Sequence, residues 1–118
     1  MSQPNLFERH AAGEIDSREV TLYALGEFQS RGKVLAEREL ALDRLRGALR
    51  RAAEEFNAEE LSDEDAARAL ESLGATVRRV PTFFAKHPFR VVVPQTLAER
   101  ARAEFEARRA ASAQETNA

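Results

Sequence analysis

Residues 62–94 of this chain read SDEDAARALESLGATVRRVPTFFAKHPFRVVVP and contain its clearest signals for secondary structure. Ser62 followed by three acidic residues is typical of a helix start, because the hydroxyl caps the first turn and the acids complement the helix dipole. Gly74 predicts the end of that helix. Beyond it, β-branched residues on both sides of a proline-bracketed loop predict strands over 76–80 and 89–93. The stretch therefore predicts a helix followed by a β-hairpin.

The same stretch is unusual in its charge. No Asp or Glu occurs from residue 72 to residue 98, although 32% of the whole chain is charged, so the segment is locally basic. Its basic residues are Arg78, Arg79, Lys86, His87 and Arg90, and its aromatic residues are Phe83, Phe84 and Phe89. Arginine and lysine neutralise phosphates and aromatic rings stack on unpaired bases, so the hairpin predicts a contact with nucleic acid. The phenylalanines equally suit a core that anchors the hairpin, and the residues alone leave both roles open.

Upstream, residues 33–56 predict a single long helix, because they are rich in Leu, Ala, Glu and Arg. A large apolar residue recurs every seven positions, at Leu35, Leu42, Leu49 and Phe56, and Leu45 occupies the second position of the same stripe. A stripe of this kind packs along the whole length of a helix. It serves as an oligomer seam, as a groove for a partner helix or as part of the chain's own core, and the sequence does not decide between these roles.

The remaining segments complete a predicted α+β fold with a helical hairpin. Residues 20–28 suit either a strand or a helix, and we expect a helix because both flanks favour one. A last helix is expected from residue 95 or 96 to about residue 110. The chain is thus divided into an N-terminal arm over 1–17, a single domain over 18–110 and a disordered tail over 111–118.

Composition narrows the class of protein. The chain has 118 residues, a net charge of −2 and no cysteine, so disulfides and thiolate chemistry are excluded. No apolar run approaches the roughly 20 residues that span a membrane. The polar N-terminus has no signal-peptide pattern, and we expect a cytoplasmic protein. The core available to such a short chain is modest, so we also expect a homo-oligomer, most simply a homodimer.

Residues 66–79 and 89–93 resemble the recognition helix and the wing of winged helix-turn-helix proteins. The likeness rests on the step Leu73-Gly74 from a helix into a strand, on the basic hairpin and on the returning strand. It lies within residues 33–94. Proteins of this kind commonly bind duplex DNA as dimers, with the second helix in the major groove. The resemblance therefore implies DNA binding, although the acids at the start of this helix would repel phosphates.

Patterns for catalysis or metal binding do not occur in the sequence. His10 and His87 are the only histidines, and neither has the spacing of a metal ligand. No glycine-rich phosphate loop is present. We expect no enzyme activity, no cofactor and no metal. The leading hypothesis is a non-enzymatic, homo-oligomeric protein that contacts nucleic acid through the hairpin. The alternative is a protein–protein adaptor or regulatory subunit that acts through the leucine stripe.

Overall fold

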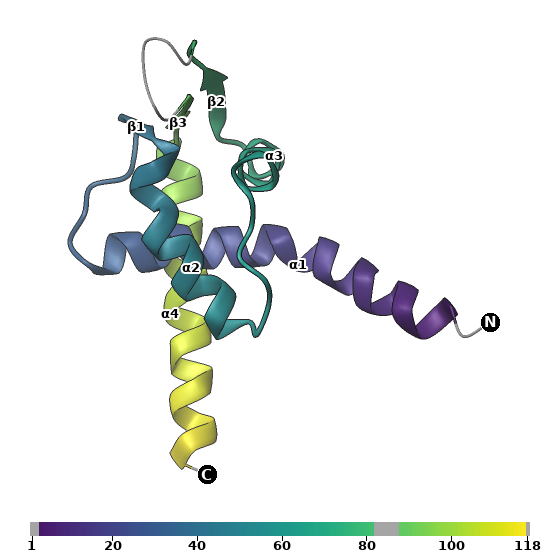
Figure 1. The fold of residues 1–118 in the computed structure, drawn as a ribbon. Helices are drawn as coiled ribbons and strands as arrows, with labels where there is room; N and C mark the ends of the chain where they lie inside the picture. Colours follow the sequence, from purple (N-terminus) through teal and green to yellow (C-terminus); the bar gives the residue numbers. More distant parts are fainter. Residues whose placement is uncertain (1–2, 82–87, 118) are drawn as a thin grey trace.

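The computed structural model describes residues 3–81 and 88–117, with side chains described from residue 17 to residue 113 outside that gap. Helices and a three-stranded antiparallel sheet confirm the predicted α+β class. In chain order the elements are α1 (Gln3–Ser30), β1 (Glu39–Ala41), the 3-10 helix η1 (Leu42–Leu45), α2 (Arg46–Glu55), α3 (Asp63–Leu73), β2 (Thr76–Arg79), β3 (Phe89–Val92) and α4 (Gln95–Asn117). Figure 1 shows α1 and α4 crossing, with the sheet beyond the N-terminal end of α4.

The segment from α3 to β3 folds as the sequence predicts. The Ser62 hydroxyl accepts a hydrogen bond from the Asp65 backbone N–H at 3.1 Å. Gly74 ends the helix with a φ of 115°, a conformation that favours glycine because a Cβ atom would be strained there. β2 and β3 pair antiparallel, and the Val80 N–H donates to the Pro88 carbonyl at 2.7 Å beyond the last strand pair. α3 is therefore followed directly by the edge strand β2.

The sheet contains a third strand, which the sequence does not predict. The strand order is β1-β3-β2, so β3 is central and pairs antiparallel with both neighbours. β1 lies inside residues 33–56, and the prediction of one helix there is wrong, because only Arg46–Glu55 is α-helical. Leu40 of β1 pairs with Val91 and is buried. Burial against β3 outweighs the helix propensity of this segment, since propensity is a weak preference that tertiary contacts override.

The crossing of α1 and α4 forms the centre of the molecule. Residues 20–28 belong to α1, which confirms the expected helix, and most of their side chains are buried. Gly26 lies so close to α4 that a Cβ atom there would be 2.4 Å from the Ala101 carbonyl oxygen. The ring of Tyr23 packs on the ring of Phe105, with centroids 4.9 Å apart. α2 also packs against α1, roughly as the predicted helical hairpin requires.

Both terminal helices extend beyond their predicted limits. The backbone of α1 is helical from Gln3, where the sequence predicts an arm up to residue 17. α4 continues to Asn117 rather than ending near Ala110. The C-terminal segment is rich in Ala, Glu and Arg, which all rank high in helix propensity. Figure 1 shows the purple part of α1 and the yellow end of α4 reaching away from the body.

An ion-pair cluster around the buried carboxylate of Glu27 ties α1 to α2. Glu27 of α1 is only 7% exposed. Its carboxylate accepts hydrogen bonds from Arg31 Nε at 2.6 Å, from Arg51 Nε at 2.7 Å and from Arg51 Nη2 at 3.0 Å. A buried carboxylate needs such partners, because it has lost its water. Arg51 comes from α2, so the cluster fixes the position of α2 on α1.

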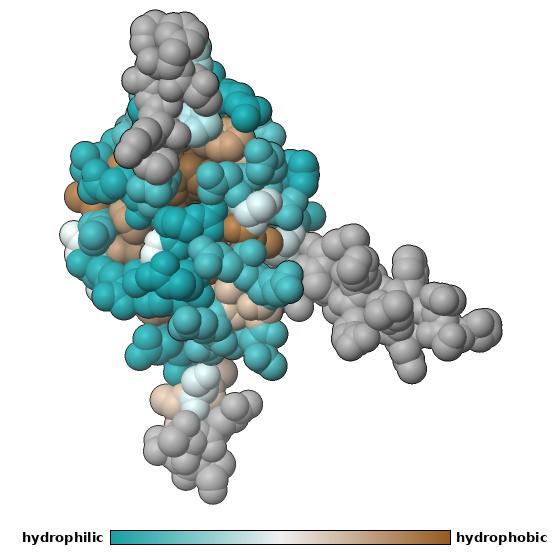
Figure 2. Space-filling model, in the orientation of Figure 1, coloured by the Kyte–Doolittle hydropathy of each residue, from teal (hydrophilic) through white to brown (hydrophobic). Residues whose placement is uncertain are grey.

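The surface of the body is mostly polar. Figure 2 shows one face that is largely hydrophilic, with small apolar areas between the polar side chains. Val34 is the large apolar residue that is most open to water among the described side chains, at 62% exposure. No helix within the described residues is long and apolar enough to cross a membrane. On the face shown, charged and polar groups of the described residues are therefore the main features open to a ligand.

Candidate nucleic-acid interface

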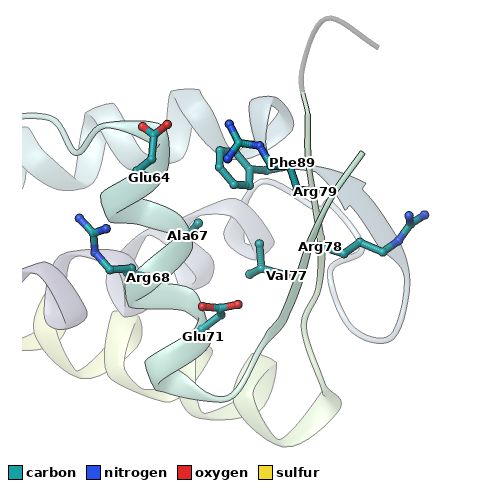
Figure 3. Close-up of a pocket in the computed structure, with 8 residues that line it drawn as sticks. All are labelled: Glu64, Ala67, Arg68, Glu71, Val77, Arg78, Arg79 and Phe89. Atoms are coloured by element: carbon teal, nitrogen blue, oxygen red, sulfur yellow. The ribbon is translucent and has the colours of Figure 1, made fainter. Parts of the chain in front are cut away.

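The hairpin strands place the predicted arginines on two different faces. Arg78 of β2 is the register partner of Arg90 in β3, and Arg79 is the partner of Phe89. Side chains alternate between the two faces of a strand, so Arg78 and Arg90 share one face. Phe89 is buried, which makes the face of Phe89 and Arg79 the core side. Figure 3 shows Arg78 pointing away from α3, whereas Arg79 lies against the ring of Phe89.

The side of the sheet that carries Arg78 and Arg90 is open to solvent. We call it the outer sheet face, and its members are Glu39, Ala41, Thr76, Arg78, Arg90 and Val92. Each of these residues is exposed or half-buried. Arg90 lies in the central strand, opposite Arg78 on one side and Ala41 on the other. The outer sheet face therefore combines two guanidinium groups with one carboxylate.

Glu39 supplies that carboxylate and pairs with Arg78. The Arg78 Nε donates to the Glu39 Oε2 at 2.8 Å, from one edge strand of the sheet to the other. Both side chains remain open to water, with 59% of Arg78 and 42% of Glu39 exposed. The hydrogen bond from Arg78 is the main reason that the pKa of Glu39 lies below its usual value, and the charges of Arg78 and Arg90 lower it further. Glu39 is therefore ionised at neutral pH and offsets part of the local positive charge.

Arg79 lines a groove on the other side of β2. Its guanidinium carbon lies 5.0 Å from the centre of the Phe89 ring, within the range of a cation–π contact. The groove separates β2 from α3 and has a volume of about 270 Å³ (Figure 3). Its lining residues are Glu64, Ala67, Arg68, Glu71, Val77, Arg78, Arg79 and Phe89. The lining includes two acids and three bases beside apolar side chains, so the groove presents no single charge to an anion.

The exposed side of α3 is acidic. Asp63, Glu64, Asp65 and Glu71 are exposed on it, and Arg68 is the only base of that helix. Arg68 pairs with Asp65 of its own helix, so it is not available to a ligand without breaking that contact. The acids at the start of α3 stabilise the helix, because they complement its dipole. They would repel phosphates, so the outer sheet face suits a phosphate better than the exposed side of α3.

The structure brings together only part of the predicted site. Phe83, Phe84, Lys86 and His87 lie outside the described residues. Arg78 and Arg90 meet on one face, and Arg79 lies on the other. Sequence reasoning missed Glu39, because this residue belongs to a three-residue strand inside the segment that was predicted to be helical. A strand this short shows no clear alternation in the sequence, and its partner strand lies far along the chain.

The leucines of the predicted stripe lie in the core of their own chain. Leu35 precedes β1, Leu42 and Leu45 belong to η1, and Leu49 belongs to α2. All four side chains are no more than 2% exposed, and Phe56 is partly buried against the same core. The interface predicted at these five residues therefore has no exposed stripe, because their side chains pack into the core of the same chain. The segment that carries them is also not a single helix.

No family model matches this chain, and neither a curated protein nor a solved structure does. Within the described residues, no group of three or more His, Asp or Glu side chains is placed to hold a metal ion. The described arginines of the predicted site lie at two places, Arg78 and Arg90 on the outer sheet face and Arg79 at the groove beside α3.

Proposed function

We propose that this chain is a non-enzymatic, homo-oligomeric protein that binds nucleic acid through the outer sheet face of the β2–β3 hairpin. One observation carries the proposal: Arg78 and Arg90 are register partners on an open sheet face. Both belong to the acid-free segment from residue 72 to residue 98. Two neighbouring guanidinium groups suit successive phosphates or two oxygens of one phosphate, because their planar N–H groups match phosphate oxygens.

The winged helix-turn-helix resemblance remains a hypothesis within this proposal. In that comparison α3 corresponds to the recognition helix and the β2–β3 hairpin to the wing. The acids on the exposed side of α3 disfavour the usual insertion of that helix into a major groove, because phosphates flank the groove on both sides. We therefore assign the phosphate contacts to the hairpin. Binding of this kind is weakly dependent on base sequence and strongly dependent on salt.

The alternative function, a protein–protein adaptor or regulatory subunit that acts through the leucine stripe, has less support. The leucines that would form its contact surface are buried in the same chain. A partner could reach them only if the core opened, and the burial of apolar side chains opposes such opening.

Fluorescence anisotropy tests the proposal with labelled duplex DNA, single-stranded DNA and RNA at two salt concentrations. The informative variant is Arg78→Gln/Arg90→Gln, which removes both guanidinium groups from the outer sheet face. Arg50→Gln/Arg100→Gln is the matched control, because both of its arginines are exposed on helices and the charge change is the same.

The hairpin variant should weaken binding strongly, and the slope of log affinity against log salt should fall by about 0.9 for each lost phosphate contact. The control should change little. Arg79→Gln should weaken binding less than the hairpin variant does, because Arg79 lies at the groove and not on the outer sheet face. Equal losses in the hairpin variant and the control would mean that only net charge matters, and no binding by the unmodified protein would reject the proposal.

A further inference from the structure

The outer sheet face contains one feature that works against the proposed binding, namely the carboxylate of Glu39. Glu39 lies on β1, opposite Val92 of the central strand, and Arg78 lies on β2 at the opposite edge of the sheet. The two side chains therefore reach toward each other over β3 and meet at 2.8 Å. Among the described residues of this face, Glu39 is the only acid.

A carboxylate and a phosphate make the same demand on a guanidinium group. The planar carboxylate and the tetrahedral phosphate each present a pair of anionic oxygens that accept charge-assisted N–H bonds. The position that Glu39 Oε2 occupies beside Arg78 Nε is therefore a position that a phosphate oxygen can take. Arg90 of the central strand is the register partner of Arg78 and adds its positive charge at the same place.

We infer that Glu39 is an internal substitute for phosphate, which holds Arg78 in the unbound protein and is displaced when a nucleic-acid phosphate binds. This inference rests on the proposed function and adds a regulator of the affinity at the same site. The displacement requires no unfolding, because both side chains are exposed on the surface of the sheet. An exposed ion pair is also weak, so a phosphate flanked by Arg78 and Arg90 can replace it.

In this arrangement Glu39 lowers the affinity of the outer sheet face for nucleic acid. Removing its charge leaves Arg78 available and takes one negative charge away from the incoming phosphate. A residue with only a structural role would not change the salt dependence of binding. Glu39 therefore differs from an ordinary surface acid in two measurable quantities, the affinity and the slope of affinity against salt.

The test is anisotropy with the labelled oligonucleotides on four proteins: unmodified, Glu39→Gln, Arg78→Gln, and the double variant. Glu104→Gln is the matched control, because Glu104 is an exposed acid on α4 and the charge change is identical. Thermal unfolding followed by circular dichroism checks that every variant is folded. Glu39→Ala is a second variant, which removes the hydrogen-bonding amide as well.

Glu39→Gln should bind the oligonucleotide about two- to fivefold more tightly at low salt. This fold-change corresponds to the strength of one exposed ion pair. Its slope against log salt should also become steeper, whereas Glu104→Gln should leave both quantities nearly unchanged. In the Arg78→Gln background the substitution at Glu39 should have a smaller effect, because the guanidinium that it releases is gone.

The outcomes separate this inference from the function on which it rests. If the unmodified protein, Glu39→Gln and Glu39→Ala all bind with the same affinity and the same salt slope, the inference is overturned and the proposed function still stands. An equal gain in Glu104→Gln would also overturn it, since the gain would then reflect net charge alone. No salt-sensitive binding by any of the proteins would overturn both.

Discussion

Gly26 is the residue on which the crossing of α1 and α4 depends. A Cβ atom at this position would lie 2.4 Å from both the Ala101 carbonyl oxygen and the Phe105 Cβ. Neither atom is the flexible end of a side chain, so the helices themselves would have to move apart. The missing side chain thus sets the distance between the two longest helices of the described structure.

Gly26→Ala should lower the free energy of unfolding by about 3 kcal/mol, as expected for overpacking at a rigid contact. The comparison variant is Gly47→Ala, where the nearest atom is Arg51 Nη1 at 3.3 Å, the end of a side chain and not backbone. That substitution should change the free energy of unfolding by less than about 1 kcal/mol, because the lower entropy of the unfolded chain is offset by the small shift of the Arg51 guanidinium, which Glu27 holds. Urea unfolding followed by circular dichroism measures both. Equal stability of the two variants would show that α1 and α4 do not cross at Gly26.

Glu27 makes stability depend on pH. Burial alone would raise the pKa of Glu27, but the hydrogen bonds and charges of Arg51 and Arg31 outweigh burial, and the pKa lies below its ordinary value of 4.5. A pKa that is lower in the folded than in the unfolded chain stabilises the fold above pH 4.5. That contribution is lost as the pH falls through the lowered pKa.

Glu27→Gln should therefore lower the free energy of unfolding by about 2 kcal/mol at pH 7, because it removes hydrogen bonds between charged groups. The difference between Glu27→Gln and the unmodified protein should shrink as the pH is lowered from 5 to 3. Glu104→Gln, at an exposed position, should show no such trend. Urea unfolding at several pH values measures the difference, and a constant difference across this range would contradict the role of Glu27.

At the scale of single elements, α3 gives the clearest test of a local sequence signal. Ser62→Ala removes the side chain that accepts from the Asp65 N–H and should lower the free energy of unfolding by about 1 kcal/mol. Ser72→Ala is the control in the same helix, because its hydroxyl bonds only to the Ala69 carbonyl within the last turn. Thermal unfolding of both variants decides the point. A loss in Ser72→Ala as large as that in Ser62→Ala would show that capping does not explain the start of α3.

The elements that could be predicted are those whose signals are local. Ser62 and Gly74 mark the two ends of α3 by side-chain and backbone chemistry that acts within a few residues. The prolines around residues 81–88 separate the hairpin strands in the same way. These signals do not depend on the rest of the fold, so reading the sequence was enough to place α3, β2 and β3.

The segment from residue 33 to residue 45 could not be predicted in this way. Its composition favours a helix, and its leucines recur at a helical spacing. The structure places Leu40 against Val91 in the sheet and joins Ala36 to Val93 by a bridge. These partners come from the other end of the chain, and no local pattern shows them. The same limit hid Glu39 from the candidate site, although Arg78 and Arg90 were both predicted.

For the molecule as a whole, the two terminal helices give an extended shape. The radius of gyration is 15.3 Å, compared with about 13.5 Å for a compact domain of this length. The proposed function includes a homo-oligomer, so two or more copies of this extended chain are expected to associate.

Light scattering on the purified protein at micromolar concentration should give the mass of two or more copies of the 13.2 kDa chain. The mass should fall toward that of one chain on dilution if the association is reversible. A mass of 13.2 kDa at every concentration tested would reject the oligomer and leave the nucleic-acid site to act in a monomer. Arg78→Gln/Arg90→Gln serves as the control, because it should not change the mass.

Under the proposed function, phosphates contact the outer sheet face and not α3. The most direct measurement is a titration of ¹⁵N-labelled protein with the oligonucleotide that binds most tightly, followed through the amide signals. The largest shifts should fall on Glu39, on Thr76–Arg79 and on Phe89–Val92, with small shifts along Asp63–Leu73. Shifts concentrated on α3, or no shifts at a concentration that saturates anisotropy, would contradict the account.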